Sequence, residues 1–214
     1  MKTLNIPFIE DLESLEYDML KATMEIKAAH EATDVADWSE QFPYKHETEF
    51  HIARSRTHIV IVYKVKEKGI KATMTEDNGP VWQDSCCDFF VSDPLDGTYY
   101  NFEMNSIRYV LASKRKSRNK FKYLSKEQPS RIIRHTSIER RPAEDADKEY
   151  EWAMAICIPF ALISTEPEHL PASLRANFYK CADMSAHLHY LSWNPIPVPA
   201  PDFHLPEYFG TIIL

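Results

Sequence analysis

The chain has 214 residues, of which 44% are hydrophobic and 27% charged, a composition typical of globular proteins and not of disordered chains. Its 25 basic and 32 acidic residues give a net charge of -7, which argues against a nucleic acid as the main partner. Fourteen prolines, four glycines and 12% aromatic residues favour many short strands over a helical bundle or a glycine-rich nucleotide-binding sheet. We expect one domain over residues 1–214.

The sequence carries no signal-peptide-like apolar stretch at its start and no apolar run of membrane-spanning length. We therefore expect a cytoplasmic protein that does not bind membranes, with a secreted parent whose signal was removed as the alternative. The cysteines lack C-x-x-C spacing and the density of a disulfide scaffold. We expect free thiols at Cys86, Cys87, Cys157 and Cys181, and no cofactor.

The strand signals begin after an irregular start. Residues 12–31 have no clean helical or strand period, so residues 1–34 are predicted to form an irregular extension packed on the domain. Residues 57–65 are apolar on both faces and β-branched, as in a central strand. Residues 85–91 form another apolar run between two turn-forming clusters.

Residues 98–105 alternate between polar and apolar side chains, which predicts a strand with one polar face. Because side chains alternate along a strand, Asn101, Glu103 and Asn105 are expected to point together away from the core or into a polar groove. The more distant Trp152 is in phase with Tyr150 and Met154, so it is expected to pack in the core. Trp38 is also expected to be structural.

The second half of the chain has a charged stretch and three more strands. Residues 114–149 are mostly charged and are expected to form exposed strands and turns. Further strands are predicted at 150–158, 177–181 and 208–214, with an ordered proline-rich loop at 193–202. Short strands separated by turns predict an all-β antiparallel β-sandwich, jelly-roll or immunoglobulin-like, with long ordered loops.

Three segments, at 81–91, 189–195 and 201–210, resemble the family 9 carbohydrate-binding modules, and most closely their stand-alone bacterial branch. The resemblance extends upstream through residues 50–66 and covers roughly residues 35–214. It implies an antiparallel β-sandwich, in agreement with the strand pattern. It also implies non-catalytic carbohydrate binding in polysaccharide catabolism, with recognition of the reducing end of β-linked glucan or xylan oligosaccharides.

The same resemblance implies the site residues. Trp82 and Trp193 match the two tryptophans that sandwich a sugar in the family, and Asp88 stands where the family usually has Glu. Arg108 lies where the wider family uses an arginine, but strand parity sets it opposite Asn101, so a turn or bulge near residues 106–107 is required. The candidate ligand-binding residues are therefore Trp82, Trp193, Asp88, Asn101, Arg108 and Glu103.

These residue types suit a sugar. An indole face stacks on the apolar C–H face of a pyranose ring. Carboxylates, amides and guanidinium groups fix the hydroxyls at its edge through charge-assisted hydrogen bonds. The expected partner is a mono- or oligosaccharide.

Other functions remain open at this point. A xylanase-like glycoside hydrolase would use two of the carboxylates of Asp84, Asp88 and Glu103 as a catalytic pair. Asp84 is also a candidate ligand for structural calcium, as the resemblance implies for some family members. A haem domain would use Met154 with His187 or His189 as axial ligands.

Overall fold

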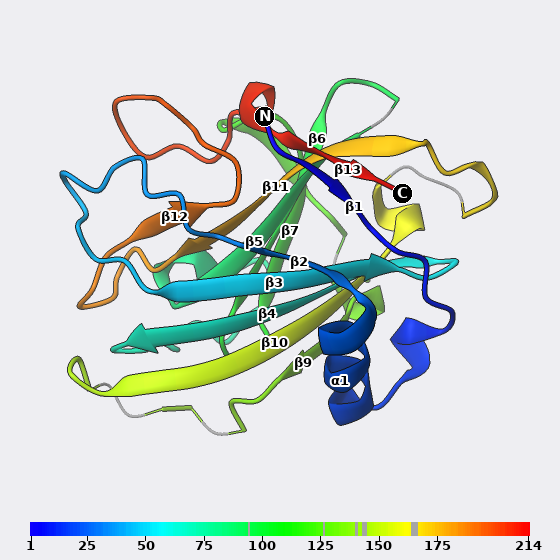
Figure 1. Cartoon of the computed structure of the whole chain (residues 1–214). Helices are drawn as coiled ribbons and strands as arrows, with labels where there is room; N and C mark the ends of the chain where they lie inside the picture. Colours follow the sequence, from blue (N-terminus) through cyan, green and yellow to red (C-terminus); the bar gives the residue numbers. More distant parts are fainter. Residues whose placement is uncertain (94, 126, 140, 143–144, 164–166) are drawn as a thin grey trace.

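Two β-sheets pack face to face in the computed structural model, which describes all residues except 94, 126, 140, 143–144 and 164–166 (Figure 1). The larger sheet has the order β1-β13-β11-β5-β6-β7-β8, with β12 also paired to β11. Its pairs are antiparallel except for β1 with β13. Its strands are β1 (Thr3–Asn5), β5 (Cys86–Ser92), β6 (Tyr99–Asn105), β7 (Val110–Ser117), β8 (Lys120–Tyr123), β11 (Ser173–Cys181), β12 (Tyr190–Ser192) and β13 (Gly210–Ile213).

The smaller sheet has the order β2-β3-β4-β10-β9, and all of its pairs are antiparallel. Its strands are β2 (Ala29–Ala32), β3 (Glu47–Arg54), β4 (His58–Lys68), β9 (Ile133–Thr136) and β10 (Glu149–Pro159). One α-helix, α1 (Tyr17–Lys27), covers the outer face of this sheet (Figure 1). Short 3-10 turns are η1 (Leu12–Ser14), η2 (Val81–Gln83), η3 (Pro129–Arg131), η4 (Phe160–Ile163), η5 (Pro167–His169) and η6 (Pro206–Tyr208).

The main core lies between the two sheets. Alternate residues of β4, such as Ile61 and Tyr63, meet alternate residues of β5, such as Phe89, and Trp152 of β10 completes this layer with only 3% of its surface exposed. Trp152 is therefore a core residue, as predicted.

A second aromatic cluster lies on the opposite, outer face of the larger sheet. Phe90, Tyr99 and Tyr179 point outward from neighbouring strands, and the loop that follows β12 packs over them. Trp38 belongs to this cluster, and its indole N–H donates to the carbonyl of Val198 in that loop, at 2.8 Å. Trp38 is therefore structural, and the proline-rich segment is an ordered loop, both as predicted.

The predicted all-β antiparallel sandwich is confirmed, and the strand expected at 57–65 is β4, at the centre of the smaller sheet. The prediction of an irregular segment at 12–31 is wrong, because it contains η1, α1 and β2. The signal for α1 is weak because Leu20 and Met24, spaced four residues apart, are its only buried side chains. Burial against β3 and β4 stabilises this helix more than its own sequence pattern suggests.

The charged stretch forms the end of β7, the exposed strand β8, and β9 with their turns, as expected. Residues 126, 140 and 143–144 of that stretch lie outside the described residues. All four cysteines are free and buried. Within the described part of the chain, no helix has the length and apolar character of a membrane span.

Candidate functional site

A cavity of about 270 Å³ lies against the outer face of the larger sheet, beside the loop that follows β12. Outward-pointing side chains of β5, β6 and β7 reach it because residues two apart on a strand share a face. Its lining includes Trp82, Asp88, Glu103, Arg115, Tyr190 and His204. Three of the six predicted site residues, Trp82, Asp88 and Glu103, therefore meet in one cavity.

The two carboxyl groups in the cavity come from neighbouring strands. Asp88 and Glu103 are register partners in the β5–β6 ladder, and only 2% and 5% of their surfaces are exposed. Burial, reinforced by the nearby Glu103, raises the pKa of Asp88 well above its usual value. Burial also raises the pKa of Glu103, to about 7. Carboxyl groups in this setting hold protons near neutral pH, so they can donate as well as accept hydrogen bonds.

Asn101 links Glu103 to Arg115. The amide nitrogen of Asn101 donates to Glu103 Oε1 at 2.7 Å, and its carbonyl oxygen accepts from Arg115 Nε at 2.8 Å and from the hydroxyl of Ser113. Asn101 has no exposed surface and does not line the cavity. It was predicted to bind the ligand directly, and the structure gives it the role of holding two cavity residues in place.

Arg115 supplies the guanidinium group of the cavity. Its Nη1 donates to the carbonyl of Arg118 at 2.9 Å, and its guanidinium carbon lies 4.2 Å from the ring centroid of Phe121. With Nε bound by Asn101, the plane of this group is fixed. A fixed planar donor suits bidentate recognition of neighbouring oxygens.

Aromatic surface lines the cavity from several elements. Trp82, in η2, is half-buried, whereas Phe121 and Tyr123 of β8 are 45% and 40% exposed. All three side chains line the cavity, together with Tyr190 and Phe203 from the C-terminal part of the chain. The site therefore combines exposed ring faces with buried polar groups.

The prediction that Trp193 forms one wall of a sugar slot is wrong. This tryptophan has no exposed surface and belongs to the main core between the sheets. Its ring meets Phe50 edge-on at a centroid distance of 6.2 Å and Phe178 at 5.5 Å. Gly210 leaves room for it, since a Cβ at that position would come 2.5 Å from the indole. A side chain enclosed on every side cannot stack on a ligand, so Trp82 and Trp193 do not form a slot.

The prediction for Arg108 is also wrong. The required turn exists after β6, and Arg108 occupies it with a left-handed φ of 69°. The turn leaves Arg108 exposed and outside the cavity, where its carbonyl oxygen accepts from Arg134 Nη1 at 3.2 Å. Arg115, seven residues later and on a strand, was missed because its register opposite Tyr99, which brings its side chain to Asn101, is a property of the β6–β7 ladder.

Asp84 does not fit a calcium site. Its two carboxylate oxygens accept hydrogen bonds from the backbone N–H groups of Thr73 and Met74, the hydroxyl of Thr73 and the side-chain amide of Asn105, all at 2.7–2.9 Å. Calcium ligands are oxygens that converge on one point, whereas donors surround this carboxylate. Asp84 therefore anchors the 73–74 segment to the end of β6.

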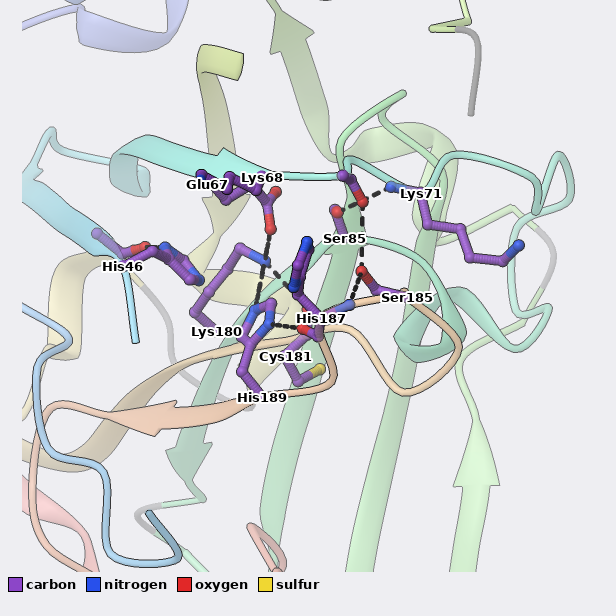
Figure 2. Close-up of polar contacts among 12 residues, drawn as sticks. His46, Glu67, Lys68, Lys71, Ser85, Lys180, Cys181, Ser185, His187 and His189 are labelled. Atoms are coloured by element: carbon purple, nitrogen blue, oxygen red, sulfur yellow. Dashed lines mark hydrogen bonds and ion pairs between the residues drawn. The ribbon is translucent and has the colours of Figure 1, made fainter. Parts of the chain in front are cut away.

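A buried charged cluster that was not predicted from the sequence lies between the sheets (Figure 2). The ammonium group of Lys180 donates to Glu67 Oε2 at 2.9 Å, to the carbonyl of Cys181 at 3.2 Å, and to His189 Nε2 at 2.9 Å. His189 Nδ1 donates to the carbonyl of His187 at 2.7 Å. Burial, with the charge of Lys180, lowers the pKa of His189 well below its usual value, so this ring is neutral.

The cluster also removes the haem alternative. Met154, which both versions of that alternative require, is enclosed in the main core with no exposed surface. His189 Nε2 is engaged by Lys180, and His187 Nε2 lies 2.8 Å from the carbonyl of Ala146. These side chains do not offer a pair of axial ligands on an open face.

Comparison with known proteins gives one family. The sequence model of carbohydrate-binding family 9 matches residues 18–214 of this chain. The chain is similar to a candidate carbohydrate-binding protein from Bacteroides uniformis ATCC 8492, at 32% identity and a TM-score of 0.91 over 99% of this chain and 98% of that one. No curated protein matches.

More distant similarity is found to a family 9 carbohydrate-binding module from Caldicellulosiruptor kristjanssonii. Its complex with glucose matches at 9% identity and a TM-score of 0.61, over 99% of this chain and 95% of that one. Its complex with cellotriose matches at 10% identity and a TM-score of 0.59, over 99% and 93%. At these identities the likeness establishes the fold.

Proposed function

Because the chain belongs to carbohydrate-binding family 9, we propose that it binds a mono- or oligosaccharide, without cleaving it, in the cavity lined by Trp82, Glu103 and Arg115. The observation that carries this proposal is the meeting of exposed ring faces and fixed polar groups in one small cavity. At about 270 Å³, the cavity is slightly smaller than the roughly 300–1,000 Å³ typical of small-molecule sites. It suits one or two sugar rings.

The aromatic platform in this proposal is revised from the sequence-based one. Trp82 offers one face to a pyranose ring, and the exposed rings of Phe121 and Tyr123 replace Trp193 as the other apolar surface. Burial of a C–H face against an indole contributes both hydrophobic and electrostatic stabilisation. The fixed guanidinium of Arg115 and the carboxyl of Glu103 then bind hydroxyls at the ring edge.

The solved complexes support a substrate class for this proposal. The Caldicellulosiruptor kristjanssonii module binds glucose and cellotriose, so a β-linked glucan, or a xylan of similar geometry, is the class proposed for this chain. Recognition of a reducing end would use the buried polar groups of the cavity, which can bind the hydroxyl of the terminal ring.

The arrangement of the carboxyl groups supports binding over hydrolysis. Asp88 and Glu103 are direct cross-strand partners and lie side by side on one wall of the cavity. A glycosidase places its two carboxyl groups on either side of the scissile bond. The carboxylate of Asp88 is moreover an acceptor for the thiol of Cys86, at 3.0 Å.

Calorimetric titration tests the proposal. Glucose, cellotriose, xylotriose and their borohydride-reduced alditols would be titrated into the wild type and Trp82→Ala, with Phe8→Ala as an exposed aromatic control outside the cavity. We expect wild-type Kd values of roughly 1 μM to 1 mM, about -8 to -4 kcal/mol. Loss of the Trp82 ring lowers affinity about tenfold or more, since an aromatic platform contributes on the order of 1.4 kcal/mol.

Weaker binding of the alditols than of the intact sugars would support recognition of the reducing end. Equal affinity of Trp82→Ala and wild type would remove the ring from the site. Absence of binding across the panel, with product release from chromogenic glycosides, would favour the xylanase-like hydrolase instead.

A further inference from the structure

Two thiols and a carboxyl group meet beneath the floor of the cavity. Cys86 of β5 and Cys181 of β11 are register partners across the ladder, and Asp88 follows Cys86 two residues later on the same face. Cys86 Sγ donates to Asp88 Oδ1 at 3.0 Å, and Cys181 Sγ to Asp88 Oδ2 at 3.7 Å. One ligand atom from each of the three residues lies within 4.8 Å of the others.

This trio is buried but reachable. The exposed fractions of Cys86, Asp88 and Cys181 are 0%, 2% and 3%, and the last two line the cavity. An ion in the cavity would therefore meet Asp88 and Cys181 first, with Cys86 directly behind them.

A second trio, His46, Glu67 and His189, has similarly close ligand atoms but a different occupant. There the ammonium group of Lys180 already lies 2.9 Å from both Glu67 Oε2 and His189 Nε2 (Figure 2). Burial tends to lower the pKa of Lys180, but the neighbouring Glu67 carboxylate outweighs it and the pKa is raised. A second cation at that point would be repelled by the ammonium, so the lysine itself acts as the cation of this cluster.

Among the described residues, the hydrogen bonds and ion pairs of the thiol trio include no ammonium or guanidinium group. Adjacent residues of a strand point to opposite faces, so the Lys180 side chain lies between the sheets while the Cys181 sulfur lies on the outer face, as Figure 2 shows for the two side chains. The carboxylate of Asp88 is within hydrogen-bond distance of both sulfurs, and Cys181 Sγ also lies 3.9 Å from the carbonyl of Trp82.

We propose that Cys86, Asp88 and Cys181 form a binding site for a thiophilic divalent cation of the zinc or cadmium type, entered from the sugar cavity. Two thiolates and one carboxylate are a ligand set that favours such ions over calcium or magnesium, which prefer oxygen. Three protein ligands leave the fourth tetrahedral position on the cavity side, for water or a hydroxyl group.

The exchange balances in charge. One divalent ion enters, two S–H bonds break, two metal–sulfur bonds form, and two protons leave to solvent. Where Asp88 is ionised, the net charge of the buried trio is the same before and after, so the exchange does not add the large cost of burying an uncompensated charge. Where Asp88 is protonated, its proton leaves as well and the trio gains one negative charge. Burial raises the pKa of the Cys86 thiol, so the ion must compete with tightly held protons and binding strengthens as pH rises.

The test uses the full chain, kept reduced with a phosphine. Cadmium chloride would be titrated into the protein in weak buffer, recording the ultraviolet thiolate-to-cadmium charge-transfer band and the protons released with a pH indicator. We expect saturation at one ion per chain, with two protons released per ion. A third proton is released where Asp88 is protonated.

Variants locate the ion. Substituting a residue that only hydrogen-bonds to a metal ligand lowers metal affinity roughly 10–100-fold. Cys86→Ala and Cys181→Ala remove a ligand itself, so each is expected to lower cadmium affinity by more than that. Cys87→Ala is the matched control, because Cys87 is adjacent and equally buried but points into the main core. Asp88→Asn keeps the shape of the carboxyl group and is expected to weaken binding while keeping the charge-transfer band.

Each contrary result is distinct. A wild type that gives no charge-transfer band and releases no protons overturns the proposal, whether or not the variants fold. A band that survives in both Cys86→Ala and Cys181→Ala overturns it as well. Cadmium binding without a band, lost in His189→Gln, would place the ion at the Lys180 cluster and also overturns it. None of these results bears on sugar binding, which is measured separately.

Discussion

Asp88 and Glu103 face the cavity as direct partners on β5 and β6, each almost wholly removed from solvent. Two buried acids side by side disfavour the state in which both are ionised. The two carboxyl groups at the ligand site therefore lower the free energy of unfolding by an amount that depends on pH.

The variant Glu103→Gln tests this pH-dependent loss of stability. Burial raises the pKa of Glu103 from 4.5 to about 7 in the folded state. The unfolded chain therefore releases this proton first, and wild-type stability is expected to fall as pH rises from about 4.5 to about 7. Glutamine keeps an oxygen that accepts from the Asn101 amide, and it has no proton to release. The stability of the variant is therefore expected to fall less with pH than that of the wild type, so that the variant is the more stable protein at neutral pH. Urea unfolding of both proteins between pH 4.5 and 7.5 measures this difference in the free energy of unfolding.

The matched control is Glu151→Gln, since Glu151 is exposed on β10. Its stability profile is expected to follow that of the wild type. A Glu103→Gln profile with the wild-type slope would contradict the assignment.

Arg115 and Arg108 provide a test variant and a matched control for sugar binding. Arg115→Met removes the guanidinium held by Asn101 in the cavity, and hydrogen bonds to charged groups contribute about 1.5–3 kcal/mol, so affinity should fall by roughly tenfold or more. Arg108→Met removes an exposed guanidinium outside the cavity and should leave affinity unchanged. Calorimetry with the preferred sugar measures both. Equal losses in the two variants would reject the site as drawn.

Trp193→Ala is expected to act on stability and not on the site. Removing a fully buried aromatic side chain typically costs about 3–5 kcal/mol. Sugar affinity of the remaining folded protein should match the wild type, in contrast to Trp82→Ala. Denaturant unfolding and calorimetry below the unfolding transition separate the two effects. Lost affinity in a folded Trp193→Ala protein would count against a purely structural role.

Lys180→Met is expected to destabilise the fold strongly. The substitution leaves the carboxylate of Glu67, itself only 1% exposed, without its cationic partner, and breaking a buried pair in this way costs about 3–5 kcal/mol. The double variant Lys180→Met with Glu67→Gln removes both charges and should recover much of that loss. Lys66→Met, which breaks exposed pairs with Glu149 and Glu151, should change the free energy of unfolding little. Urea unfolding of the set measures the coupling.

The local pattern of apolar and polar residues in the sequence was sufficient to predict the β-sandwich. β4 is apolar on both faces because it is central and covered on both sides, and β6 alternates because one of its faces carries the polar network. Asn101 and Glu103 share that face because the strand period is two, which is a property of the sequence alone.

The site was predicted only in part, because several of its positions depend on ladders and loops. Trp193 follows β12 directly, and its backbone N–H donates to the carbonyl of Phe178, which turns the indole inward. Arg115 reaches the cavity through its pairing opposite Tyr99. Arg108 was chosen because the family resemblance implies an arginine there, and the direction of the turn that carries it cannot be read from the sequence. Lys180 and Glu67 are 113 residues apart, and no local period indicates that they meet.

The pairing of β1 with β13 has a practical meaning for handling the protein. Lys2 accepts from the backbone of Thr211 and donates to the side chain of Asn194, while Ile6 donates to Ile213. Removal of the first six residues would leave one side of β13 with unpaired backbone groups, open to the strand of another molecule. It would also remove the Lys2 N–H that donates to Asn194 Oδ1, beside the tryptophan that fills the core. A short N-terminal truncation should therefore reduce solubility as well as stability, although it touches nothing in the cavity.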